Sequence, residues 1–148
     1  MTPCWYWNLI ADFIKDRVIW EPFYGNGVSS KDLSQFCTVM NTKTQDFFDV
    51  LNPPEADFVL TNPPYSIKIR IIERLEELDL DYILLLPANF MFSRFWQKRC
   101  RENTAKYSMG VCPKRMGFVK KGKDTLTCPF TCAFFCRGIA TPGHYFYV

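Results

Sequence analysis

The 148-residue sequence lacks any long hydrophobic run and contains a single histidine, His144. Its longest strongly apolar stretch, Tyr82–Pro87, is far shorter than the roughly 20 residues that a membrane-spanning helix requires. The amino-terminal residues do not combine a basic segment with a following apolar segment, as a secretory signal would. We therefore expect a soluble intracellular protein, in the cytoplasm or the nucleus, without a membrane partner.

A disulfide framework and a zinc site both find little support in the cysteine pattern. The seven cysteines are an odd number, and most lie in apolar or mixed segments. Cys128, Cys132 and Cys136 recur every fourth residue, but structural zinc sites usually combine closer cysteine pairs with a fourth ligand. We predict free thiols that pack as small hydrophobic side chains, and no metal site.

The composition, with 48% apolar and 22% charged residues, is that of an ordinary globular domain. Strand signals alternate with helix signals from residue 17 to residue 102, which predicts an α/β fold with a doubly wound, mostly parallel sheet. The predicted strands are 17–20, 37–40, 57–60, 82–86, 107–112, 116–119 and 132–136. We expect the last two to form a hairpin, with 132–136 antiparallel, so that the sheet has seven strands.

A rigid turn follows the predicted strand 57–60. Pro63 and Pro64 cannot continue a sheet ladder, because proline has a fixed φ and no N–H group. The turn therefore holds Asn62 and Tyr65 at the carboxyl end of a buried strand, where open α/β sheets bind ligands. Taken alone, the segment is also compatible with an incidental strand end, so other segments must support a functional role.

A second turn follows strand 17–20, with the sequence Glu21-Pro22-Phe23-Tyr24-Gly25-Asn26-Gly27. Gly25 and Gly27 can adopt a positive φ, and the helix expected after them begins with N–H groups that lack helical partners. The Glu21 carboxylate suits a cationic ammonium group better than a pyrophosphate. The GxGxxG pattern is incomplete as well, which argues against a dinucleotide.

Together the two turns resemble motifs of the S-adenosylmethionine-dependent amino-methyltransferases. Asn62-Pro63-Pro64-Tyr65 is similar to their catalytic motif, and the turn from Glu21 to Gly27 is similar to the cofactor-binding motif of the adenine-N6 methyltransferases. Leu85-Leu86-Pro87-Ala88-Asn89 and Arg115-Met116-Gly117-Phe118 resemble segments of phage- and virus-type DNA N6-adenine methyltransferases in particular. The resemblance implies a Rossmann-like class I methyltransferase fold. It also implies one minimal catalytic domain over residues 1–148, without a separate target-recognition domain.

The resemblance implies S-adenosyl-L-methionine as the cofactor. The implied cofactor-binding residues are Thr2, Pro3, Glu21, Pro22, Phe23, Tyr24, Gly25, Asn26, Gly27, Asn41, Asp46, Phe47 and Asn62. The implied catalytic residues are Asn62, Pro63, Pro64 and Tyr65. Asn41 stands where the family usually has an acid that holds the ribose hydroxyls, which predicts modest cofactor affinity because an amide lacks charge-assisted hydrogen bonding.

Basic residues are concentrated in one segment of the chain. Residues 94–123 carry ten lysines and arginines against one acid, whereas residues 1–93 carry seven basic and thirteen acidic residues. Such a segment suits a phosphate backbone, although a solvated helix face would carry similar charge. The predicted substrate-binding residues are Tyr65, Ser66, Phe90, Phe92, Lys114, Arg115, Lys120, Lys121 and Lys123.

We therefore expect methylation of the exocyclic N6 of adenine in nucleic acid, with DNA favoured over RNA, by direct in-line transfer. Asn62 and the Pro63 carbonyl would accept the amine hydrogens, and Tyr65 would stack on an unstacked base. An RNA base, a protein glutamine, or a non-catalytic nucleic-acid-binding subunit are the alternatives. The sequence leaves open a homo- or heterodimer, and the resemblance suggests a viral or phage source.

Overall fold

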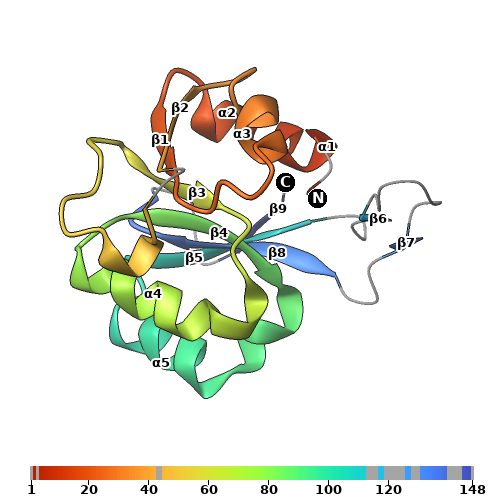
Figure 1. The fold of residues 1–148 in the computed structure, drawn as a ribbon. Coiled ribbons are helices and arrows are strands. Elements are labelled where there is room, and N and C mark those ends of the chain that lie inside the picture. The colour runs from red at the N-terminus through yellow and green to blue at the C-terminus, as the bar shows by residue number, and fades with distance from the viewer. Residues whose placement is uncertain are drawn as a thin grey trace.

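The computed structural model describes residues 2, 4–42, 45–112, 117–118, 126–127, 131–139 and 145–147, and it contains a central sheet between two layers of helices (Figure 1). The strands of this sheet are β1 (Val18–Glu21), β2 (Thr38–Asn41), β3 (Phe58–Thr61), β4 (Tyr82–Pro87), β5 (Tyr107–Val111), β8 (Cys132–Arg137) and β9 (Tyr145–Tyr147). Their order is β2-β1-β3-β4-β8-β5-β9. Only β8 runs antiparallel to its neighbours, so β1, β3 and β4 all end at the same edge.

Helices cover both faces of the sheet. On one face lie α1 (Cys4–Asn8), α2 (Ala11–Ile14) and α3 (Val28–Leu33), and on the other lie α4 (Lys68–Glu77) and α5 (Arg94–Glu102) (Figure 1). Three short 3-10 helices, η1 (Phe47–Asp49), η2 (Tyr65–Ile67) and η3 (Ala88–Phe92), follow β2, β3 and β4. Among the residues described, no helix has the length and apolar character needed to cross a membrane.

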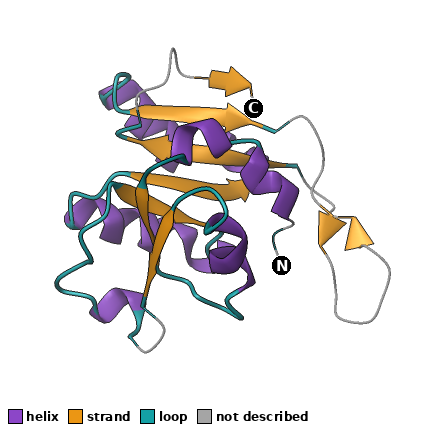
Figure 2. Cartoon of the chain, turned by 90° about the horizontal axis from the view of Figure 1, so that it is seen from above, coloured by secondary structure: helices purple, strands orange, loops and turns teal. Residues whose placement is uncertain are grey.

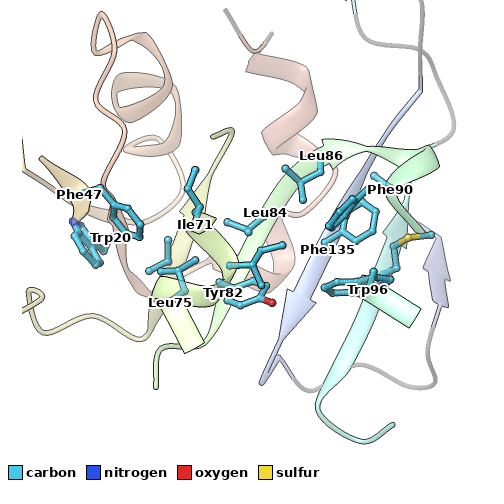
Figure 3. Close-up of a cluster of buried hydrophobic side chains, with 14 of the residues drawn as sticks. Trp20, Phe47, Ile71, Leu75, Tyr82, Leu84, Leu86, Phe90, Trp96 and Phe135 are labelled. Atoms are coloured by element: carbon cyan, nitrogen blue, oxygen red, sulfur yellow. The ribbon is translucent and has the colours of Figure 1, made fainter. Parts of the chain in front are cut away.

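The central strands are apolar along their whole length because both of their faces are buried. Successive side chains of a strand point to opposite faces of a sheet. Ile83 and Leu85 accordingly pack with the α1–α3 layer, whereas Leu84 and Leu86 pack with the α4–α5 layer. Figure 3 shows the second cluster, in which Trp96 of α5 lies against the same face of the sheet. The two-sided burial explains the nearly continuous apolar run of β4.

The predicted α/β fold class is confirmed, and six of the predicted strands belong to the central sheet. The prediction that 116–119 is the seventh strand of this sheet is wrong. The seventh strand is β9, which pairs with β5 at the edge of the sheet. The expected hairpin between 116–119 and 132–136 is wrong as well. Instead, β6 (Gly117–Phe118) pairs with β7 (Leu126–Thr127) in a two-stranded sheet that lies apart (Figure 2). The reason is that β8 already pairs along both edges, with β4 and β5.

The cysteines in the described part of the chain are free thiols, as the sequence predicts. Cys132 and Cys136 are fully buried on β8, where they pack as small apolar side chains. Cys128 lies outside the described residues.

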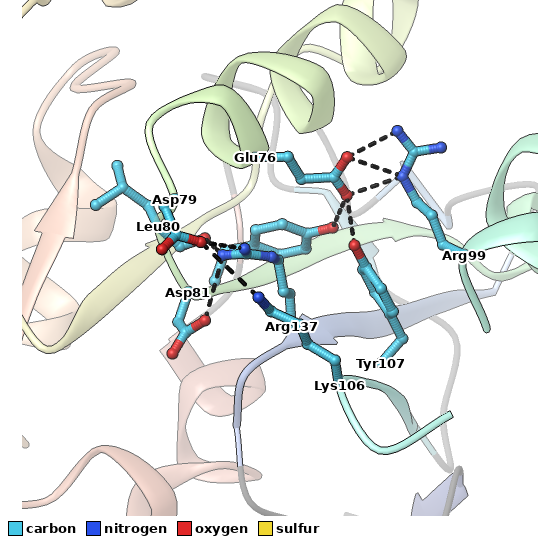
Figure 4. Close-up of polar contacts among 9 residues, drawn as sticks. Glu76, Asp79, Leu80, Asp81, Arg99, Lys106, Tyr107 and Arg137 are labelled. Carbon is cyan, nitrogen blue, oxygen red and sulfur yellow. Dashed lines mark hydrogen bonds and ion pairs between the residues drawn. The ribbon is translucent and has the colours of Figure 1, made fainter. Parts of the chain in front are cut away.

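A network of polar side chains joins the helices to the sheet at the edge where β4 begins (Figure 4). The Glu76 carboxylate of α4 accepts hydrogen bonds from Arg99 of α5, at 2.7–3.0 Å, and from the hydroxyls of Tyr107, at 3.0 Å, and Tyr82, at 3.4 Å. A second group is centred on Arg137 of β8, whose guanidinium donates to Asp79 at 2.5 Å and to the Leu80 carbonyl at 2.7 Å. These bonds fix α4 and α5 against the strands.

We predict that Glu76→Ala lowers the free energy of unfolding by about 3 kcal/mol, the lower end of the range for breaking a buried ion pair. The substitution leaves Arg99 and two tyrosine hydroxyls without their acceptor. The Arg99–Glu76 ion pair is mostly buried, because the two side chains are only 18% and 19% exposed. Urea unfolding followed by circular dichroism measures the change. Glu77→Ala on the same helix is the control, because its surface pair with Arg74 contributes less than about 1 kcal/mol. Equal losses in the two variants would contradict the assignment.

Candidate functional site

The two turns singled out in the sequence meet at the carboxyl edge of the sheet. β1 and β3 are parallel neighbours, with Ile19 opposite Phe58, so both turns leave the sheet side by side. The Thr61 hydroxyl at the end of β3 donates to Glu21 Oε1 at the end of β1, over 2.5 Å. The Phe23 amide donates to the same oxygen at 3.1 Å. The glycine turn and the Asn-Pro-Pro turn are thus held together by one carboxyl group.

Glu21 lies in an environment that disfavours its charge. The residue is 1% exposed, and burial raises the pKa of its carboxyl group to about 8, against the opposing effect of the hydrogen bonds from Thr61 and Phe23. At neutral pH the carboxyl group therefore carries a proton in the absence of a cation. A buried acid of this kind becomes a carboxylate again when a positive ligand group binds beside it.

The glycine turn depends on backbone angles that favour glycine. Gly25 has φ of 54° and Gly27 has φ of 77°, as the sequence analysis anticipated. A Cβ atom on Gly27 would lie 2.4 Å from the Tyr24 hydroxyl, so only glycine allows that ring to lie over the turn. Asn26 supports the start of α3, because its Oδ1 accepts from the Val28 amide at 3.3 Å. The turn is therefore compact, and its backbone is open to a ligand at Gly25.

A cleft of about 560 Å³ lies between the two turns. Its walls are Phe23, Tyr24, Gly25, Asn62, Pro63, Pro64 and Tyr65. Asn62 is oriented by Thr2, whose hydroxyl accepts from Asn62 Nδ2 at 2.7 Å. The other amide atom, Oδ1, is buried and has no hydrogen-bond partner among the described residues. A residue of the cleft wall therefore carries an oriented amide with one unpaired acceptor, which a ligand or a water molecule could satisfy.

A second hollow of about 380 Å³ lies beside η1. It adjoins the cleft, because the two share the walls Phe23, Tyr24, Gly25 and Pro64, and we call the pair the groove. The far end of this groove is lined by Asp46, Phe47, Phe48, Thr42 and Ile67, among others.

The far end of the groove contains several residues that the sequence analysis assigned to cofactor binding. Phe47 is buried and packs against Phe23, with ring centres 5.0 Å apart. Asp46 caps η1, since its Oδ1 accepts from the Phe48 amide at 2.8 Å. Asn41 ends β2 directly opposite Glu21, one residue before Thr42. The second strand thus ends one residue later than the predicted 37–40, at Asn41, which does not itself line the groove among the residues described.

Tyr65 stands between the groove and a third hollow of about 630 Å³, because it lines both. Its hydroxyl lies 3.7 Å from the Cys132 sulfur. The third hollow, which we call the η3 pocket, is lined by Tyr65, Lys68, Pro87, Asn89, Phe90, Phe92 and Ser93. Phe90 is buried in the core, whereas Phe92 is 72% exposed. Ser66 is exposed next to Tyr65.

Part of the predicted site lies outside the described residues. These residues are Pro3, Lys114, Arg115, Lys120, Lys121 and Lys123. Of the other basic residues in 94–123, Arg94, Lys98 and Arg101 are exposed on α5. Arg99 is different, because its guanidinium binds Glu76 and lies 3.5 Å from the centre of the Phe95 ring. Counting Arg99 with the phosphate-binding surface is therefore wrong.

The sequence analysis missed residues whose role depends on a neighbouring strand or helix. Thr61 joins the two turns through its hydrogen bond to Glu21. The sequence feature that could have indicated this role is a hydroxyl residue at the end of an otherwise apolar strand. Thr42 lines the far end of the groove, and its hydroxyl oxygen is buried without a partner in the described part of the chain. Lys68 lines the η3 pocket, and the sequence analysis assigned it no role.

Comparisons with known proteins relate this geometry to a known fold. No protein-family model matches the sequence, and no curated protein matches it significantly. Among solved structures, the 23S rRNA methyltransferase ErmE superposes with a TM-score of 0.56 at 13% identity, covering 91% of this chain and 70% of that one. A candidate RNA methyltransferase from Pyrococcus horikoshii gives 0.56 at 13% identity, covering 90% and 80%.

A third structure, precorrin-6y C5,15-methyltransferase from Geobacter metallireducens GS-15, gives a TM-score of 0.54 at 9% identity, with 88% and 87% covered. Identities this low establish the shared fold alone. The chain therefore has a Rossmann-like methyltransferase fold, and proteins with this fold act on unlike substrates.

We predict that Glu21→Gln changes how stability depends on pH. The folded pKa of about 8 lies above the ordinary value of 4.5, so the folded protein binds a proton that the unfolded chain has lost. The wild-type free energy of unfolding should therefore fall between pH 4.5 and 8, by up to about 1.4 kcal/mol per pH unit. The variant should lack this component. Urea unfolding at several pH values measures both proteins, and parallel curves would contradict a protonated Glu21.

Proposed function

We propose that this protein is an S-adenosylmethionine-dependent N-methyltransferase that methylates the exocyclic N6 of adenine in nucleic acid. The observation that carries the proposal is the buried Asn62 Oδ1, which lacks a hydrogen-bond partner among the described residues and belongs to a residue that lines the cleft between the two turns. A buried acceptor left in this way costs free energy unless a ligand donates to it. An exocyclic amino group is such a donor.

The groove has the shape and the chemistry that the cofactor requires. Its walls include part of the glycine turn and several aromatic side chains, and the buried Glu21 ends β1 just before that turn without lining the groove itself. Glu21 would bind the methionine ammonium group, Gly25 would allow close approach of the backbone, and Phe47 would pack along the adenine ring. S-adenosylmethionine, when bound, supplies a methyl group on a positively charged sulfur. The family resemblance in both turns supports the same cofactor.

The residues of the Asn-Pro-Pro turn would prepare the amine for attack. The lone pair of an exocyclic adenine amine is delocalised into the ring, so the nitrogen is a weak nucleophile. Asn62 Oδ1 and the Pro63 carbonyl would each accept one N–H, which localises the lone pair and directs it along the path of transfer. Thr2 orients the Asn62 amide for this role. Positioning then supplies most of the acceleration, with reacting atoms about 3–3.5 Å apart.

A nucleic acid is the substrate that best fits the surroundings of the cleft. Tyr65 is half-buried beside Asn62 and offers a ring on which an unstacked base can lie. The exposed basic residues of α5 suit a phosphate backbone. The motif resemblance favours DNA, whereas two structural neighbours whose names refer to RNA methyltransferases favour RNA as the second candidate.

We predict that cofactor binding releases a proton through Glu21. At pH 7 a carboxyl group with a pKa of about 8 is mostly protonated, and an ammonium group beside it would favour the carboxylate. We expect calorimetry with S-adenosylmethionine to give different binding enthalpies in phosphate and in Tris. The difference should equal the difference between the ionisation enthalpies of the two buffers, multiplied by about one released proton. Glu21→Gln should abolish that difference. A wild-type enthalpy that does not depend on the buffer would contradict this role of Glu21.

We predict that Asn62→Ala lowers kcat by about 100-fold or more, the scale seen when one preorganised hydrogen-bonding group is removed from a transition state. Cofactor affinity should change much less, because the interaction matters mainly at the transition state. Labelled cofactor and a panel of single-stranded and duplex DNA and RNA, followed by nucleoside analysis, measure the rate and the product. Equal turnover by both proteins would exclude the mechanism. If the protein methylated a glutamine peptide and none of the nucleic acids, glutamine would replace adenine as the proposed substrate.

A further inference from the structure

We propose that the η3 pocket binds the nucleotide adjacent to the target base, with the Phe92 ring as its stacking surface. This inference rests on the proposed function and extends it, because it specifies a strand of at least two nucleotides rather than a free nucleoside as the preferred substrate. The pocket has a volume of about 630 Å³ and is separate from the groove assigned to the cofactor. Among the described residues, Tyr65 is the one that lines both this pocket and the catalytic cleft.

The first argument is the position of Phe92. With 72% of its surface exposed, it is one of the most exposed large apolar side chains among the described residues, yet it does not belong to a loose loop. It lies in η3, between Phe90, which is buried, and Ser93, which caps α5. Ser93 donates to the Phe90 carbonyl through its amide at 3.0 Å and its hydroxyl at 2.7 Å. The ring is therefore presented on a fixed turn, which lowers the entropic cost of stacking.

The second argument is that η3 is anchored to the core through Phe90. The Phe90 ring packs edge-on against Phe135 of β8, with centres 5.5 Å apart, and also against Trp96 of α5 at 6.3 Å. Ser93 Oγ in turn accepts from the Trp96 amide at 3.2 Å. Because Phe90 supplies the apolar anchor, burial of Phe92 is not needed for folding. Its exposure leaves the ring available for stacking on a base.

The third argument is the charge of the pocket. Among the described residues that line it, one is a cation, Lys68, and none is a carboxylate. The Lys68 ammonium is held in place, because it donates to the Tyr65 carbonyl at 3.0 Å and lies 5.4 Å from the centre of the Phe90 ring. An ammonium group has three donors, so it can also bind a phosphate oxygen. Asn89 is exposed at the same pocket and can donate to or accept from a base edge. An aromatic ring with one fixed cation is the combination that binds single strands.

The fourth argument is the shared wall. Tyr65 lines both the catalytic cleft and the η3 pocket, so a strand with its target base beside Asn62 brings the next nucleotide to the other side of Tyr65. Two neighbouring bases on opposite sides of one side chain cannot remain stacked on each other. The substrate is therefore a single strand, or a duplex opened over both nucleotides.

The test compares Phe92→Ala with Leu51→Ala, a matched control in which another exposed apolar residue, 77% exposed and outside the η3 pocket, is truncated. The substrates are adenosine and short single-stranded DNA and RNA oligonucleotides that contain one adenine. We expect Phe92→Ala to lower the ratio of kcat/KM for the oligonucleotide to that for adenosine by about 5- to 150-fold, the loss that corresponds to one stacked base. Leu51→Ala should leave the ratio unchanged. The DNA and RNA arms show which strand is preferred.

A second measurement separates this proposal from the proposed function. Fluorescence anisotropy with the same labelled oligonucleotides reports binding without requiring methyl transfer. Weaker binding by Phe92→Ala than by Leu51→Ala supports the η3 pocket even if no product forms, in which case the proposed function fails alone. Equal binding and an equal kcat/KM ratio in the two variants would overturn the pocket assignment, while methylated adenine in the product would still uphold the proposed function.

Discussion

The buried hydrogen bond from the Thr61 hydroxyl to the Glu21 carboxyl group joins the ends of two parallel strands, and the geometry of the groove depends on it. Both faces of β1 and β3 are covered by packed side chains, so neither strand can shift to relieve this contact. The residues that follow are therefore placed as a pair, with Phe23 on one turn and Asn62 on the other. A protonated acid serves this purpose well, because it joins the strands without placing a charge in the core.

The buried polar side chains at the two edges of the sheet differ in how many hydrogen-bond partners they have. At the edge where β4 begins, Glu76 and Arg137 each have several partners, although the buried Arg137 Nε has none among the described residues. At the carboxyl edge, the Asn62 oxygen is buried without a partner among the described residues, and Glu21 is held in its neutral form. Satisfied networks stabilise a fold, whereas unsatisfied groups cost free energy that a ligand can recover. The unpaired Asn62 oxygen and the neutral Glu21 are the features at the carboxyl edge on which the proposed site rests.

Much of the fold and the core of the site could be predicted from local features. The prolines after β3 and the glycines after β1 end their strands for reasons that lie within a few residues. Ser93 caps α5 as its sequence position indicates. The errors involve partners distant in the chain. Strand 116–119 was given the wrong partner because pairing depends on which strand edges other segments already occupy. Arg99 was taken for a surface charge because Glu76 lies on another helix.

By itself, the sequence determined which segments become strands and turns and which residue types stand at the strand ends. Proline geometry, glycine freedom and two-sided apolar burial act locally, so they can be recognised without coordinates. Only the tertiary structure decided that Thr61 meets Glu21, that Thr2 orients Asn62, and that Phe92 and Tyr65 line one pocket. Those relations join residues that are far apart along the chain, and the packing of strands and helices against one another sets the distances between them.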